Sequence, residues 1–267
     1  MQFVIRKLRW KLVFWIFLIT GLCLINLNAL YKIKNGLSEE FAVSTLDLIC
    51  LLLRGEPGLP ILPFQWLSIS CGLLFVPCSY SCSDLTDDAY KTLVYSKSRR
   101  AWWISKTVLI HGIPFILFSF FIVIAAIATW RPDGYRFGLL ARFEELGIFR
   151  PLAQASLCTQ AVWLLLLPCM AFCTVASIQN ALAILLGPAA AYFVSILFLS
   201  ISVGTRTGFL FPAVTMTSRA AALYEAGVSP ILVLCLMLFS DLAINGVAYG
   251  FFRKLDLMHA PYLEVNQ

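Results

Sequence analysis

The chain has 267 residues, of which 60% are hydrophobic and 13% charged, and its mean hydropathy is +0.86. Water-soluble domains are about 45–50% apolar and about a quarter charged, so the composition excludes a soluble enzyme, a secreted disulfide scaffold and a disordered chain. The net charge of +6 comes from basic residues scattered between apolar runs. This pattern is typical of chain ends beside anionic lipid and not of a nucleic-acid-binding face, so we expect an all-α, polytopic membrane protein.

Six apolar stretches are long enough to cross the roughly 30 Å of hydrocarbon in a bilayer as helices. A basic cluster precedes the first stretch, as in a signal peptide, but the apolar run is too long and no small-residue cleavage site follows it. The run from Pro151 to Thr205 has no charged side chain and suits two helices with a turn near Gln179–Asn180. The predicted spans, within a single transmembrane domain over 1–267, are residues 12–31, 64–81, 107–130, 155–178, 183–203 and 228–252.

Lysine and arginine indicate the orientation, because cytoplasmic loops carry an excess of both. With the N-terminus inside, the inner segments carry about twice the density of basic residues that the outer segments carry. Six spans then return the C-terminus to the cytoplasm beside Arg253 and Lys254. We therefore predict an N-in, C-in topology.

Two outer segments are apolar but do not match a span. Phe41–Leu53 is too short to cross, and Tyr135–Ile148 mixes apolar with charged side chains. Either segment fits an amphipathic helix in the headgroup layer or a loop folded over the bundle.

No residue pattern indicates covalent chemistry. The sequence has no Gly-Lys pair and hence no P-loop, and neither His-Glu-x-x-His nor Gly-x-Ser-x-Gly occurs. Most of the nine cysteines lie inside apolar stretches, and no Cys-x-x-Cys pair exists. His111 and His259 are the only histidines, and we interpret His111 as a polar packing residue. We expect no catalytic residue, no metal site, no disulfide framework and no cofactor bound by this chain.

The inner loop Ser81–Lys106 is the only substantial one. Thr86 is a candidate N-cap, and Asp87 and Asp88 would follow in the first helical turn, where carboxylates complement exposed N–H groups. The spacing predicts a two-turn helix below the membrane, with one apolar-aromatic face toward a cytoplasmic partner. This face is formed by Tyr90, Leu93 and Val94, and Tyr95 is the last residue of the candidate helix. The alternative is an ordinary positive-inside loop.

Basic and aromatic residues alternate after this short helix. They are predicted to anchor the next span in the inner headgroup layer, where each base contributes on the order of 1 kcal/mol and tryptophan is enriched. The predicted anchors are Lys97, Arg99, Arg100, Trp102, Trp103 and Lys106.

The run from Pro63 to Lys106 resembles bacterial ABC-2-type permeases, the membrane subunits of ABC exporters whose ATPase is a separate chain. The residues that match the family's pattern at the entry of the third helix are Lys97, Arg100, Trp102, Trp103 and Lys106. Met216, Arg219 and Arg253-Lys254-x-Asp256 resemble its closing pattern.

The resemblance implies a permease in a bacterial cell membrane that exports an amphipathic substrate such as a peptide, an antibiotic or a lipid. Two such subunits, identical or related, would form the pathway, and each would dock on a cytoplasmic ABC ATPase through a coupling helix at Thr86–Tyr95. ATP and Mg would bind to that ATPase. Short re-entrant helices in the last outer loop would correspond to Phe209–Pro212 and Ala220–Tyr224.

Asp241 lies in the middle of the last predicted span, where a carboxylate costs about 2.5–3.5 kcal/mol on insertion scales. A residue so placed faces a cavity, a partner or a polar neighbour. Asn245 lies one turn away, and Asn26 or Asn28 are candidates from the first span. Asp241 and Asn245 are predicted either to line the translocation path, to contact a second subunit, or to be structural.

Three other functions remain open from the sequence. A stand-alone transporter and a membrane immunity protein would need no ATPase. An intramembrane enzyme would need clustered ionisable residues in the spans, where the sequence offers chiefly Asp241 and His111.

Overall fold

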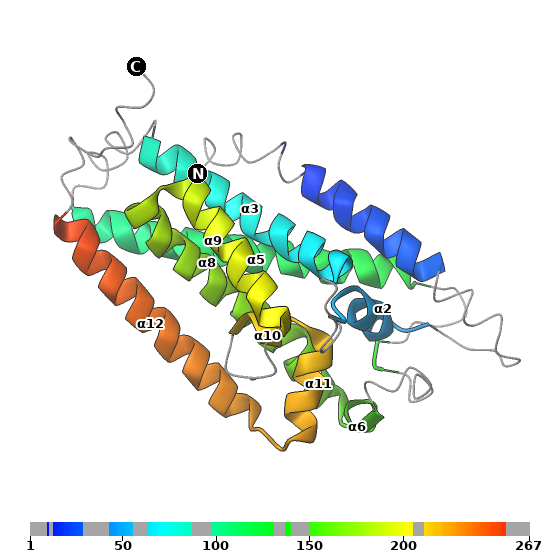
Figure 1. Cartoon of the computed structure of the whole chain (residues 1–267). Coiled ribbons are helices and arrows are strands. Elements are labelled where there is room, and N and C mark those ends of the chain that lie inside the picture. Colours follow the sequence, from blue (N-terminus) through cyan, green and yellow to red (C-terminus); the bar gives the residue numbers. More distant parts are fainter. Residues whose placement is uncertain are drawn as a thin grey trace, which may run out of the picture.

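Helices that run side by side form an elongated bundle in the computed structural model (Figure 1). The structure describes residue 10 and residues 13–28, 43–55, 63–86, 98–130, 137–139, 150–204 and 211–254, with the backbone alone for 82–86, 150 and 151. All the regular structure in these residues is helical, which agrees with the predicted all-α class.

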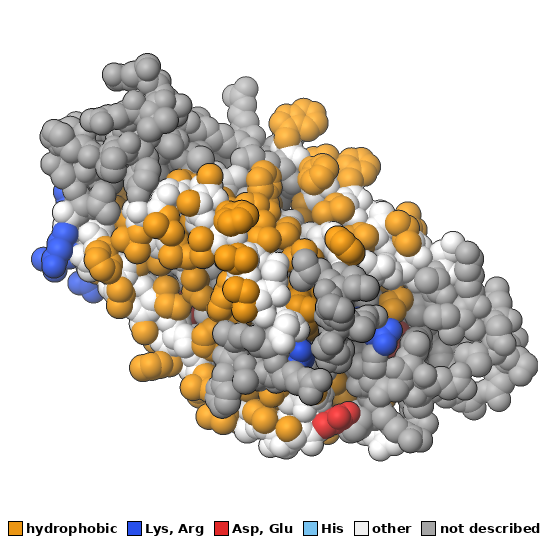
Figure 2. All heavy atoms as spheres, viewed as in Figure 1, with side chains coloured by type: hydrophobic (Ala, Val, Ile, Leu, Met, Phe, Trp, Pro, Cys, Tyr) orange, Lys and Arg blue, Asp and Glu red, His pale blue; other side chains and the backbone are white. Residues whose placement is uncertain are grey.

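Three helices of the described residues are long and apolar enough to cross a membrane. They are α5 (Arg99–Ala128), the continuous helix Leu157–Leu186 and α12 (Pro230–Lys254). Large apolar side chains on their outer faces are exposed, and hydrophobic side chains cover much of the described surface in Figure 2. Such a surface is unsuited to water and suited to lipid, so the chain is a multi-pass membrane protein.

The other predicted spans also contain helices. Val13–Asn28 and α9 (Pro188–Gly204) are apolar but shorter than the three long helices. Helix α3 (Phe64–Thr86) is long, but serines dilute its apolar character. Trp15, Ile19 and Cys23 form the buried stripe of the first helix, and Trp15 packs against Gly72 of α3.

Two helices extend into the predicted inner loop. Helix α3 continues five residues past the predicted end of its span, and α5 begins at Arg99 instead of at 107. The Ser98 hydroxyl accepts a hydrogen bond from the Ala101 N–H and so caps α5. The predicted inner loop is therefore shorter than expected, and residues 87–97 lie outside the described residues.

The turn predicted near Gln179–Asn180 is wrong. Both residues are buried inside α8 (Leu167–Leu186), and the chain reverses at Gly187, whose φ is +84°. A left-handed residue followed by proline is a common helix end, and here Gly187-Pro188 separates α8 from α9.

A π-helical turn interrupts the long helix just before a proline. Helix α7 (Leu157–Ala161) leads into the π-helical segment Val162–Leu166, and Pro168 follows in the first turn of α8. Proline lacks an N–H and its ring clashes with the carbonyl four residues earlier, and a π-turn absorbs this disruption. The helix thus continues to Leu186 despite Pro168.

Helix α8 is the centre of the bundle. It packs against α3, α5, α9 and α12, and most of its side chains are buried. Aromatic rings fill the core beside it, with Phe118 of α5 and Phe172 of α8 at a centroid distance of 6.0 Å. Every other long helix is therefore positioned by α8.

One end of the bundle is closed by short helices from segments that lie far apart in sequence. Helix α2 (Thr45–Leu52) begins with a capping box between Ser44 and Asp47, and nearly all of its side chains are buried. It packs against α5 and the π-helical segment. Of the predicted segment Phe41–Leu53, the described residues 43–53 are thus folded against the bundle, while of Tyr135–Ile148 the structure describes only 137–139.

Helices α10 (Phe211–Val214) and α11 (Thr217–Glu225) fold into the same end between α9 and α12. The Thr217 and Ser218 N–H groups donate to the carbonyls of Leu53 and Arg54, at 2.9 and 3.1 Å. The indole N–H of Trp66 donates to the Thr215 hydroxyl at 2.9 Å. These bonds join α2, α3 and α10–α11 into one cap, which we call the capped end.

At the opposite end, the start of α5 meets the end of α12. The guanidinium of Arg99 donates to the carbonyl of Arg253 at 2.8 Å, and Arg99, Arg100, Arg253 and Lys254 are all exposed. Basic side chains gather at the left edge of Figure 2, where α12 ends. We call this the basic end.

We predict that Gly55→Ala destabilises the capped end more than Gly227→Ala. Both glycines have positive φ, +53° and +72°, so alanine costs about 1–2 kcal/mol at either position. Only at Gly55 would the new Cβ lie 2.6 Å from the Cγ of buried Met216, whereas nothing lies within 4 Å of it at Gly227. Thermal unfolding in one detergent should give a clearly lower midpoint for Gly55→Ala, and equal midpoints would contradict this packing.

Candidate functional site

Polar side chains from three helices meet in the middle of the bundle. They come from α5, α8 and α12, and we call them the polar joint: Thr107, His111, Ser177, Asp241 and Asn245. The nearest atoms of His111 and Asp241, Nε2 and Oδ2, are 2.8 Å apart. Since Asp241 lies mid-span, this contact supplies the polar neighbour that a carboxylate at membrane depth requires.

The remaining contacts of the joint involve each of the three helices. The Ser177 hydroxyl of α8 lies 3.0 Å from the same Nε2 of His111. The amide of Asn245 donates to the Asp241 carbonyl at 2.9 Å and to Oδ1 at 3.3 Å. The Thr107 hydroxyl donates to Oδ1 of Asn245 at 3.4 Å, so α12 is held to α5 at two levels.

Sequence reasoning missed His111 as the partner of Asp241 and interpreted it as a packing residue. Asn26, proposed as a partner from the first span, donates instead to the Leu22 carbonyl of its own helix. A signal was present, because His111 and Asp241 are the only His, Asp, Glu, Lys or Arg residues inside the predicted spans. Ionisable residues at membrane depth pair with one another, so each was the natural partner of the other.

The joint is partly accessible. The side chains of His111 and Asp241 retain 27% and 17% of their accessible surface. Chemically, the joint can bind a proton or hydrogen-bond a polar group that arrives between α5 and α12. Among the described residues, no group of three or more His, Cys, Asp or Glu side chains is placed to hold a metal ion.

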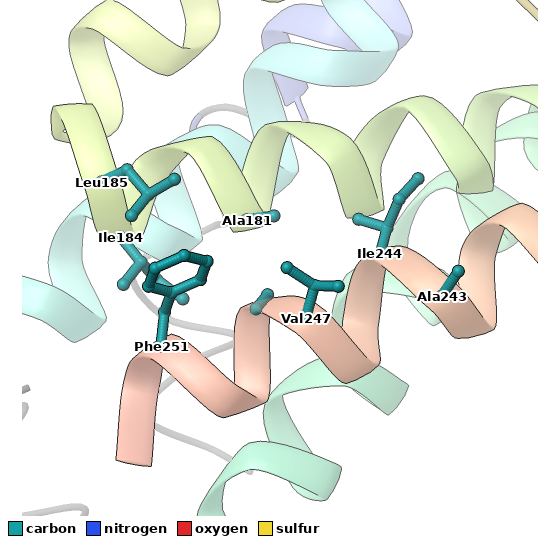
Figure 3. Close-up of a pocket in the computed structure, with 8 residues that line it drawn as sticks. Ala181, Ile184, Leu185, Ala243, Ile244, Val247 and Phe251 are labelled. Atoms are coloured by element: carbon teal, nitrogen blue, oxygen red, sulfur yellow. The ribbon is translucent and has the colours of Figure 1, made fainter. Parts of the chain in front are cut away.

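An apolar groove of about 270 Å³ lies beside the joint, between α8 and α12. Figure 3 shows its lining, which is hydrocarbon throughout. Ala181 lies one turn after Ser177, and Ile244 adjoins Asn245. An apolar group in the groove would therefore lie next to the polar side chains of the joint. The lining residues are Ala181, Ile184, Leu185, Ala243, Ile244, Val247, Ala248 and Phe251.

The aromatic residues predicted as membrane anchors lie between helices. Trp102 and Trp103 are buried, and both stack on Phe252 of α12, with centroids 4.7 and 5.5 Å apart. Lys106 is also buried, and its ammonium lies 4.7 Å from the centroid of the Trp102 ring, in cation–π geometry. The two tryptophans thus pack α5 against α12, whereas Arg99 and Arg100 are exposed at the basic end.

The predicted coupling residues fall mainly outside the described residues. Thr86 is the last residue of α3. Asp87, Asp88, Tyr90, Leu93, Val94, Tyr95 and the predicted anchor Lys97 belong to residues 87–97, which are not described. The structure does place the two ends of this segment, the last turn of α3 and the first turn of α5.

Comparison of the chain with protein-family models, with curated proteins and with solved structures gives no match.

We predict that Asp241→Ala lowers the stability of the folded chain by about 1–2 kcal/mol, because it removes the carboxylate partner of His111. The matched control is Leu242→Ala, a truncation of the adjacent side chain, which is 72% exposed and should change stability by less than about 0.5 kcal/mol. Thermal unfolding of both variants in one detergent provides the measurement. Equal losses would show that the contact contributes nothing.

We predict that Phe252→Ala separates the basic end of α12 from α5. Phe252 is 1% exposed and stacks on both tryptophans, whereas Phe251 is 51% exposed. In lipid, burying the Phe252 ring gains little transfer free energy, but its packing contacts still stabilise the bundle. We therefore expect Phe252→Ala to lower the free energy of unfolding by on the order of 2 kcal/mol. Phe251→Ala should cost much less. Tryptophan fluorescence and unfolding measure the effect, and an unchanged Trp environment in Phe252→Ala would refute the stacking.

Proposed function

We propose that this chain is the membrane permease subunit of an ABC exporter and forms the path for an amphipathic substrate, while ATP hydrolysis on a partner drives transport. The observation that carries the proposal is the segment Pro63–Lys106, which resembles ABC-2-type permeases. In the structure α3 ends at Thr86, and α5 begins at Arg99 in the basic end of the bundle.

In this proposal the basic end faces the cytoplasm. Exposed Arg99, Arg100, Arg253 and Lys254 would lie beside anionic headgroups. The segment Thr86–Tyr95 would then contact the ATPase, which holds ATP and Mg. The stacking of Trp102 and Trp103 on Phe252 would carry a displacement of that segment into α12.

We further propose six spans with both termini inside. Val13–Asn28, α3 and α9 would cross together with the three long apolar helices. Support comes from their packing, because α3 and α9 both lie against α8 and Val13–Asn28 lies against α3. Each connection between consecutive helices would then alternate between the basic end and the capped end.

The capped end would form the outer gate. Helices α10 and α11 fold back between α9 and α12, and the N-terminal residues of α11 are buried. The family resemblance suggested Phe209–Pro212 and Ala220–Tyr224 as re-entrant. Helices α10 and α11 include the second segment and the described part of the first, residues 211–212. Since their hydrogen bonds reach the end of α2, a movement of α10–α11 would also displace α2.

The site suits an amphipathic substrate. The polar joint would meet a polar group, and the groove beside it would meet an apolar one. Because α12 carries many exposed apolar side chains, a second permease subunit would complete the path along this helix, with Asp241 and Asn245 near the contact.

A second candidate is a stand-alone transporter without an ATPase. The His111–Asp241 contact favours it, because paired ionisable side chains at membrane depth mark ion and proton pathways in transporters. The two candidates differ in whether a soluble ATPase binds the chain.

We predict that the double variant Leu93→Asp, Val94→Asp loses the partner ATPase. Two carboxylates on the proposed docking face would have to be desolvated on binding, so co-purification from native membranes in mild detergent should fall at least about tenfold, the equivalent of 1.4 kcal/mol. Mass spectrometry of the co-purified proteins measures the change.

The matched control is Thr92→Asp, which adds a carboxylate to the same segment but off the predicted face. It should keep the ATPase. If the native chain purifies without any ATPase, under conditions that preserve a known permease–ATPase pair, the exporter proposal fails and the stand-alone transporter takes its place.

A further inference from the structure

The contact between His111 and Asp241 implies more than packing, because its geometry fixes where hydrogens must lie. Nδ1 of His111 is 2.7 Å from the carbonyl oxygen of Thr107, one turn earlier in α5. A carbonyl oxygen only accepts hydrogen bonds. Nδ1 must therefore carry a hydrogen, whatever the charge of the ring.

This assignment determines the other ring nitrogen. In a neutral ring with hydrogen on Nδ1, Nε2 has a bare lone pair. It lies 2.8 Å from Oδ2 of Asp241, and an ionised carboxylate is also only an acceptor. Two lone pairs would repel at that distance, so the observed contact requires one additional hydrogen between Nε2 and Oδ2.

With that hydrogen, the pair has no net charge. It is either imidazolium with carboxylate or imidazole with carboxylic acid, and both forms fit a membrane interior better than an isolated carboxylate. Without it, Asp241 carries a negative charge and its bond to His111 is lost. The hydroxyl of Ser177, 3.0 Å from Nε2, is then placed to donate to the ring in place of Asp241.

We propose that His111, Asp241 and Ser177 form a proton-binding site at membrane depth, whose occupancy decides whether His111 of α5 is hydrogen-bonded to Asp241 of α12. When the proton leaves to water, the Nε2–H···Oδ2 bond breaks and the Ser177 hydroxyl hydrogen turns to Nε2. His111 then stays hydrogen-bonded to Ser177 of α8. Between α5 and α12, the bond from Thr107 to Asn245 and the bond from Arg99 to the Arg253 carbonyl remain. The inference goes beyond the proposed function and requires no ATPase.

Few other ionisable side chains of the three helices lie near the pair. On α8, the Sγ of Cys173 lies 3.5 Å from the His111 carbonyl, and the helix has no Asp, Glu, His, Lys or Arg. On α5, Lys106 lies five residues before His111, with its ammonium over Trp102. On α12, the remaining charged side chains are Arg253 and Lys254, at its far end. The chain does not enclose the pair completely, since the side chains of His111 and Asp241 retain 27% and 17% of their accessible surface.

The sequence allows a direct test, because His111 and His259 are its only histidines. The variant His259→Gln, labelled with ¹⁵N-histidine and held in lipid nanodiscs, gives one imidazole whose two nitrogens report their hydrogens by NMR. We expect Nδ1 to be protonated throughout a pH titration. Nε2 should hold or share a proton at low pH and lose it at high pH.

Asp241→Asn, in the same background, tests the role of the carboxylate. The amide can donate to a bare Nε2, so at a pH where the native ring shares its proton with Asp241 the variant should have Nε2 unprotonated. Ser177→Ala should leave the low-pH signal in place and shift the high-pH Nε2 signal. A neutral ring with hydrogen on Nε2, or a pH response unchanged in Asp241→Asn, would overturn the proposal. The pH titration of the His259→Gln variant needs no substitution in the polar joint, so it tests the proposal even if Asp241→Asn does not fold.

Discussion

Polar groups inside an apolar bundle must find partners within the chain, and this constraint governs how the helices meet. In hydrocarbon an unpaired polar group costs several kcal/mol. The carboxylate of Asp241 on α12 meets this demand with Asn245 of its own helix and, across the helix interface, with His111 of α5. The ring of His111 also lies within hydrogen-bond distance of Ser177 of α8. At the capped end, the same demand joins Trp66 to Thr215 and Thr217 to the end of α2. The apolar contacts of α8 fill the space between these fixed points.

The sequence predicted the helical class and the approximate position of each long helix, because an uninterrupted apolar run is a strong local signal. Helix ends were less predictable. Helix α5 begins eight residues before its predicted span, because Ser98 caps it and Trp102 and Trp103 in its first turns stack on Phe252 of α12. The turn was predicted at two polar residues, Gln179 and Asn180, but both are buried inside α8, where Gln179 donates to the Leu74 carbonyl. The chain reverses instead at Gly187-Pro188, whose backbone preferences end the helix. Contacts such as His111–Asp241, 130 residues apart, depend on how helices pack, and no local pattern encodes that.

Three different groups of side chains lie along the length of the bundle. The basic end carries exposed arginine and lysine and the aromatic contact between α5 and α12. The middle carries the polar joint and the apolar groove, and the capped end carries short helices tied by hydrogen bonds between distant segments. In our proposal a displacement begins at the basic end, changes the contacts of the polar joint in the middle and opens the capped end. Helix α12 touches all three regions and packs mainly on α8, so it is the element whose movement would connect them.

The account depends on α12 crossing the membrane between the capped end and the basic end. The most direct measurement places a reporter that is active only in the cytoplasm after Lys254, and separately in the exposed turn Ala226–Gly227 between α11 and α12. A reporter active only outside the membrane at the same two sites gives the complementary reading. We predict cytoplasmic activity after Lys254 and outside activity at the turn. Both sites on one side of the membrane would contradict the account, because α12 would then not span and Asp241 would not lie at membrane depth.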